Sequence, residues 1–120
     1  MIFEVKLETP VIGLGKNNYI VLKNGIHAPN KNFKKWKKAV ILEIYSKIKN
    51  LRTWEHPCKL TLFYHPSDKR RRDATGILDG VFNVLEEIRV INDDSQIKQI
   101  NYQEINDDVD YSLYIRLDAI

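Results

Sequence analysis

The rest of the chain is best interpreted from one stretch, Asp73-Ala-Thr-Gly-Ile-Leu-Asp-Gly-Val-Phe-Asn-Val-Leu-Glu-Glu-Ile88. Its apolar residues recur every three or four positions, which predicts a helix over about residues 74–89 with one buried side. Asp73 is a suitable N-cap for that helix. The flanking segments Cys58–His65 and Ile97–Ile105 have the composition of strands. A helix between two strands is therefore predicted at the centre of the domain.

The remaining chain supplies four further predicted strands and one further helix. The strands are expected at residues 2–7, 19–22, 26–28 and 111–117, and the helix at 31–49. Asn24-Gly25 between the two short strands is a strong hairpin signal. This order predicts an α+β fold, with a mostly antiparallel or mixed sheet and two helices packed on it.

Length and composition narrow the class of protein. A chain of 120 residues fits one domain, and its single cysteine, Cys58, cannot form an intrachain disulfide. The sequence has neither a long apolar run nor the layout of a signal peptide, so we expect a cytoplasmic protein with no membrane partner. The net charge is only +3, but basic residues cluster at 31–38 and 69–72. Local basic patches suit a polyanionic ligand.

The chemistry of the chain is suggested by two short runs, Lys69-Arg-Arg-Arg-Asp73 and Asn92-Asp93-Asp94. Consecutive cations bind phosphate, whereas carboxylates beside them repel it unless a metal ion stands between. The combination of phosphate-binding cations and metal-binding acids is typical of a nuclease.

On a helical wheel, Thr75, Asp79, Asn83 and Glu86 share one polar stripe. If the loop after the helix folds back over the helix start, Asp93 and Asp94 meet Asp73 and Asp79. Two carboxylates about 4 Å apart repel by roughly 4 kcal/mol at an effective dielectric near 20, so such a cluster needs a cation or a proton. Each acid also has a simpler explanation, because an N-cap, a solvated helix face and a turn carry the same residue types.

Residues 66–97 read Pro66-Ser-Asp-Lys-Arg-Arg-Arg-Asp-Ala-Thr-Gly-Ile-Leu-Asp-Gly-Val-Phe-Asn-Val-Leu-Glu-Glu-Ile-Arg-Val-Ile-Asn-Asp-Asp-Ser-Gln-Ile97. This run resembles the RusA family of Holliday-junction resolvases. Members of that family carry a basic run, an Asp-x-Asp-Asn that opens a helix, and an Asp-Asp-x-x-Ile close. The earlier segments Gly15-Lys-Asn-Asn18 and Pro29-Asn-Lys31, followed by aromatic residues, are similar to the front of the family. The resemblance covers nearly the whole chain, and its specific part is 69–97.

The resemblance implies a single RusA-like domain over residues 1–120 that acts as a metal-dependent, homodimeric endonuclease. Such an enzyme resolves four-way DNA junctions in recombination and repair, with Mg²⁺ or Mn²⁺ and no organic cofactor, in a bacterial or phage-infected cell.

The family's acids fall on Asp73 and Asp94, with Asp93 adjacent. The chain departs from the pattern at Thr75, where the family has its second Asp, and at Gly76, where it has Asn. Some members of the wider family carry the missing acid further down the helix, which is the position of Asp79. We therefore predict Asp73, Asp79 and Asp94 as catalytic metal ligands, with Asp93 orienting a water or holding a second ion. The alternative is a catalytically degenerate relative that binds DNA or a regulator without cutting.

The cations are assigned to DNA. The predicted DNA-binding residues are Lys69, Arg70, Arg71, Arg72, Lys16, Lys31, Lys34, Lys35 and Lys38. Arginine grips phosphate in a bidentate way, and such contacts position DNA by its charge and shape. For the four lysines at 31–38, a solvated helix face is the simpler alternative. A third class of function, a phosphotransfer or protein-interaction domain with an acidic pocket, predicts binding to branched DNA that is weak and independent of salt.

Overall fold

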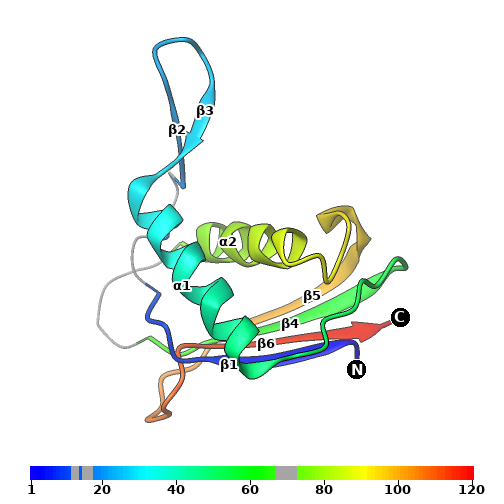
Figure 1. Ribbon diagram of the computed structural model, residues 1–120. Coiled ribbons are helices and arrows are strands. Elements are labelled where there is room, and N and C mark those ends of the chain that lie inside the picture. Colours follow the sequence, from blue (N-terminus) through cyan, green and yellow to red (C-terminus); the bar gives the residue numbers. More distant parts are fainter. Residues whose placement is uncertain (12–13, 15–17, 67–72) are drawn as a thin grey trace.

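The structure is a computed structural model that describes residues 1–11, 14, 18–66 and 73–120. Its elements are β1 (Phe3–Leu7), β2 (Tyr19–Val21), β3 (His27–Pro29), α1 (Lys31–Lys47), β4 (Cys58–Tyr64), α2 (Ala74–Glu87), the 3-10 turn η1 (Asp94–Gln96), β5 (Ile97–Glu104) and β6 (Leu113–Ala119). Four strands form a sheet in the order β1-β6-β4-β5, and both helices cover one face of it (Figure 1). The predicted α+β class is confirmed.

The sheet is mixed because of the connection through α2. Strand β6 pairs antiparallel with both β1 and β4, whereas β4 and β5 are parallel. The segment after β5 passes over the end of β4, where the Ile105 amide donates to Tyr64 O at 2.8 Å and the His65 amide donates to Ser112 O at 2.8 Å. Strands β5 and β6, consecutive in sequence, are therefore separated by β4.

The core lies between the sheet and the two helices. Every second residue of β1, β4 and β6 is buried, so each of these strands has one apolar face. Helix α1 contributes Phe33, Trp36, Val40 and Ile44, and α2 contributes mainly Ile77, Val81, Val84 and Leu85. Among the described residues, no helix is both long and apolar enough to cross a bilayer.

Gly80 lets the two helices and the segment before β2 approach each other closely. A Cβ at this position would lie 3.2 Å from both Trp36 Cζ3 and Leu14 Cδ1. The space beside Gly80 on α2 is thus filled by the side chains of Leu14 and Trp36.

The β2–β3 pair forms a separate two-stranded hairpin that projects from the body at the start of α1 (Figure 1). Its turn uses Gly25 at φ 80°, a backbone conformation that favours glycine. Asn24 Oδ1 accepts from the Ile26 amide at 3.1 Å, and the Leu22 amide donates to Ile26 O at 2.8 Å. The hairpin predicted from Asn24-Gly25 is confirmed.

Candidate metal centre

Three carboxylates converge where α2 ends and β5 is about to begin. Glu86, Asp93 and Asp94 each offer an oxygen atom, and these three atoms lie within 4.8 Å of one another. The amide of Asp94 donates to Glu86 Oε2 at 3.2 Å, which joins the loop to the helix. We call these three residues the acid triad.

The chain turns sharply after α2, and this turn brings the triad together. Arg89 follows the helix with φ 60°, a left-handed conformation that is uncommon for residues other than glycine. Thr53 Oγ1 donates to Arg89 O at 2.6 Å, and the Trp54 amide donates to Val90 O at 2.8 Å. The segment before β4 therefore holds the turn in place.

The loop itself is fixed by a capping box. Asp93 caps η1 by accepting from the Ser95 amide at 3.0 Å, and Gln96 Oε1 accepts in return from the Asp93 amide at 3.1 Å and also from the Asn92 amide at 2.7 Å. The amide group of Gln96 also donates to Trp54 O at 2.7 Å. The two aspartates are thus held beside Glu86 by hydrogen bonds that do not depend on a ligand.

The triad contains more negative charge than its donors neutralise. Burial and the charges of Asp94 and Asp93 raise the pKa of Glu86, against the hydrogen bond from the Asp94 amide. Burial, the hydrogen bond with Asp93 and the charges of Asp93 and Asp79 raise the pKa of Asp94. The pKa of Asp93 is lowered by hydrogen bonds from the Ser95 amide and from Asp94. The raised pKa values of Glu86 and Asp94 reflect repulsion among the neighbouring carboxylates, which a bound cation would relieve.

This donor set fits Mg²⁺ or Mn²⁺. Hard divalent ions prefer oxygen ligands, and Mg²⁺ is commonly bound by a few carboxylates while it keeps several waters. Asp93 and Asp94 are exposed and Glu86 is half-buried, so the three carboxylates are accessible from solvent.

The structure separates the predicted ligands Asp73, Asp79 and Asp94. Asp73 caps α2, accepting from the Thr75 amide at 3.0 Å and from Thr75 Oγ1 at 2.6 Å. It precedes Glu86 by thirteen residues, which is about 20 Å along a helix. Asp94 lies beside Glu86, so the loop does not fold back over the helix start.

Asp79 occupies an intermediate position on α2. It is exposed and lies about 10 Å along the helix from Glu86. Its charge contributes to the raised pKa of Asp94. Asp79 therefore extends the negative surface of the acid triad, and its role as a ligand stays a prediction.

The predicted DNA-binding cations are described only in part. Lys31, Lys34, Lys35 and Lys38 are exposed on α1. Lys16, Lys69, Arg70, Arg71 and Arg72 lie outside the described residues. Sequence reasoning passed over Lys37, whose Nζ lies 3.3 Å from Glu87 Oε1 and donates to Asn83 Oδ1 at 3.2 Å.

Sequence reasoning did not single out Glu86 as a candidate ligand or Gln96 as the residue that holds the acidic loop. The helical wheel puts Glu86 on the polar stripe of the helix. The available signal for its place in the acidic site is its position at the end of α2, just before an acidic loop. Asp93 and Gln96 have the spacing of a capping box, with an acid at the cap and a glutamine three residues later.

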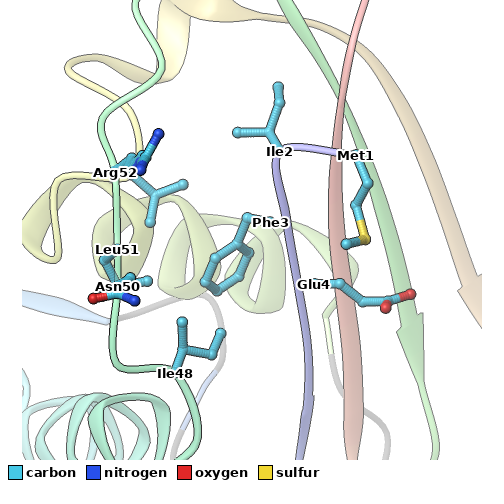
Figure 2. A pocket seen from close by; sticks show the side chains of 9 residues that line it. Met1, Ile2, Phe3, Glu4, Ile48, Asn50, Leu51 and Arg52 are labelled. Atoms are coloured by element: carbon cyan, nitrogen blue, oxygen red, sulfur yellow. The ribbon is translucent and has the colours of Figure 1, made fainter.

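A different hollow lies between β1 and the segment after α1. It has a volume of about 260 Å³, and Phe3, Ile48 and Leu51 line it (Figure 2). None of the predicted site residues borders this hollow. The acid triad is the candidate site because three carboxylates converge there.

No model of a known protein family matches the chain, and no curated protein matches it. The resemblance to RusA-like resolvases accordingly stays a prediction from the sequence.

Proposed function

We propose that this protein is a metal-dependent endodeoxyribonuclease that cuts branched DNA such as a four-way junction. The convergence of Glu86, Asp93 and Asp94 within 4.8 Å carries the proposal. The basic runs of the sequence and its resemblance to RusA-like resolvases support the choice of substrate.

The acid triad would hold Mg²⁺ or Mn²⁺, with no organic cofactor. When bound, such an ion lowers the pKa of a water ligand and offsets the charge that develops on the phosphate oxygens. Glu86 and Asp94 provide ligand oxygens, and Asp93 is placed to orient a water. Gln96 is a positioning residue because it holds the backbone of Asn92 and Asp93.

The lysines of α1 supply the contacts to DNA away from the cut. Lys31, Lys34, Lys35 and Lys38 are exposed on one helix, so they can reach several phosphates. A homodimer belongs to this proposal, because two symmetric nicks across a junction require two copies of the site.

The proposal is tested by cleavage of a labelled four-way junction beside a linear duplex of the same sequence. We expect nicking of the junction in Mg²⁺ or Mn²⁺, none in chelator, and loss of nicking in Glu86→Gln. The matched control is Asp108→Asn, an exposed aspartate in the loop that follows the far end of β5. Intact binding of the junction without cleavage in either metal would overturn the enzyme proposal.

A second candidate is a DNA-binding relative that does not cut. It is favoured by Thr75, which stands where the family has an acid and here donates to Asp73. Paramagnetic broadening by Mn²⁺ in an NMR spectrum tests the metal site on which the enzyme proposal depends. The enzyme proposal predicts selective broadening of the amides at 92–96, whereas a site without metal predicts none.

A further inference from the structure

The projecting β2–β3 hairpin exposes an unusual number of apolar side chains. Ile20 is 46% exposed, Val21 64%, Leu22 43% and Ile26 58%. A two-stranded hairpin has little core of its own, so these side chains remain in contact with water. An exposed apolar finger of this kind marks a contact surface.

The same part of the chain is strongly and uniformly basic. Residues 9–42 contain seven lysines and no aspartate or glutamate. Since the whole chain has a net charge of +3, the remaining residues together carry −4. Lys23 lies at the hairpin tip, and Lys31, Lys34 and Lys35 are exposed where α1 leaves the hairpin. Lysines thus lie at the tip of the apolar finger and on the helix at its base.

We propose that the β2–β3 hairpin is a wedge that enters the branch point of DNA, where its apolar side chains contact unstacked bases while the lysines contact phosphates. This inference rests on the proposed function, because it takes branched DNA as the ligand. Apolar side chains that open base steps, flanked by cations on the backbone, are an established way of binding deformed DNA. Bases at a branch point are already less stacked than those of a duplex, so they cost less to separate.

The base of the hairpin is tied to α2, the helix that carries Glu86 of the acid triad. Asn83 Nδ2 donates to Tyr19 Oη at 2.6 Å, and the Tyr19 ring meets the edge of Phe33 with centroids 5.3 Å apart. Asn18 Nδ2 donates to Gly76 O at 3.0 Å. Burial, followed by the charges of Asp79, Glu86 and Glu87, raises the pKa of Tyr19. The base of the hairpin therefore lies beside the acidic face of α2.

Charge favours DNA over a second copy of this chain as the occupant. Two copies joined through their hairpins would bring two acid-free, lysine-rich segments together, and like charges in contact are costly. A polyanion instead neutralises these lysines and releases its counterions.

The test places 2-aminopurine at the branch point of a four-way junction and measures its fluorescence in chelator, so that no cleavage is needed. We expect the native protein to increase the fluorescence, because unstacking relieves quenching. The double variant Val21→Thr and Ile26→Thr should reduce that increase at least five-fold while changing affinity less than three-fold. Threonine keeps the β-branch that favours a strand, so the hairpin is retained. Val109→Thr, on an exposed apolar residue of the acidic loop, is the matched control and should leave the increase unchanged.

The outcomes distinguish this inference from the function on which it rests. Binding without a fluorescence increase, or an equal increase in the double variant, overturns the wedge and leaves the nuclease proposal standing. A native dimer that dissociates in the double variant, with the fluorescence increase retained, identifies the hairpin as a contact between copies and also overturns the wedge. Failure of the native protein to bind the junction at low salt overturns both proposals.

Discussion

Glu43 and the acid triad differ in how well the fold stabilises their negative charge. The Glu43 carboxylate accepts from the Glu8 amide at 2.7 Å, the Thr9 amide at 3.0 Å, Thr9 Oγ1 at 2.7 Å and Lys47 Nζ at 2.7 Å. Burial raises its pKa, but these hydrogen bonds outweigh burial and lower the pKa from 4.5 to about 2. In the triad, three carboxylates share few donors, and the pKa values of Glu86 and Asp94 are raised.

The difference lies in the number of donors that each carboxylate receives. Glu43 joins the end of β1 to α1, and its charge is satisfied within the fold. The triad leaves charge unsatisfied at an accessible place. Glu43 and Glu86 are both acids on a helix that face a neighbouring segment. What distinguishes the structural carboxylate from the candidate ligand is therefore the number of hydrogen-bond donors that each receives.

The largest expected effect is on Glu86, whose carboxylate accepts from the Asp94 amide and has a raised pKa. Glu86→Gln keeps the size of the side chain but removes one charge from the triad. Loss of a metal ligand should lower the rate of junction cleavage by about a hundredfold or more, as expected for a residue that acts on the metal. Mn²⁺ titration should show a matching loss of affinity. Equal affinity in the variant and in Asp108→Asn would contradict the role of Glu86.

Glu43→Gln should have the opposite pattern, with lower stability and an unchanged metal site. Gln cannot accept from all four donors, and the Glu43 side chain is only 14% exposed. Charge-assisted hydrogen bonds that are partly buried predict a loss of about 2 kcal/mol in the free energy of unfolding. Urea denaturation measures this loss. A change in Mn²⁺ affinity would show that the two regions are coupled.

The sequence was sufficient to predict the helices and strands of this fold, though not the 3-10 turn η1. The spacing of apolar residues predicted α1 and α2, and Asn24-Gly25 predicted the hairpin. These signals depend only on residues that are close together in the sequence. The parallel pairing of β4 with β5 is not local, since it depends on how the chain crosses through α2. The register that buries Leu60 and Leu62 opposite β6 likewise requires the assembled sheet.

The candidate site could be predicted only in part. The acidic loop at Asp93 and Asp94 was identified, because two adjacent acids after a helix are visible in the sequence. Its partner was not identified, since the choice between Glu86 and Asp73 depends on the direction in which the loop turns. The left-handed conformation of Arg89 sets that direction, and no glycine marks it in the sequence.

The pH dependence of stability should come from Glu43 within a defined window. Because its folded pKa of about 2 is below the ordinary value of 4.5, its contribution is complete above pH 4.5 and is lost as the pH falls toward 2. The free energies of unfolding of the native protein and Glu43→Gln should therefore converge over that window. A difference that stays constant down to pH 2 would mean that the charge of Glu43 is not what stabilises the fold.

The smallest effect is expected for Asp73→Asn. Asparagine caps a helix as well as aspartate does, so the free energy of unfolding should change by less than about 0.5 kcal/mol. Asp73 is also about 20 Å along α2 from Glu86, so Mn²⁺ affinity at the triad should stay within two-fold of native. With both of these quantities unchanged, the cleavage rate of this variant measures the role of Asp73 in the reaction itself. A large loss of Mn²⁺ affinity would instead place Asp73 at the metal, as the family resemblance implies, and would require a second copy of α2 to bring it there.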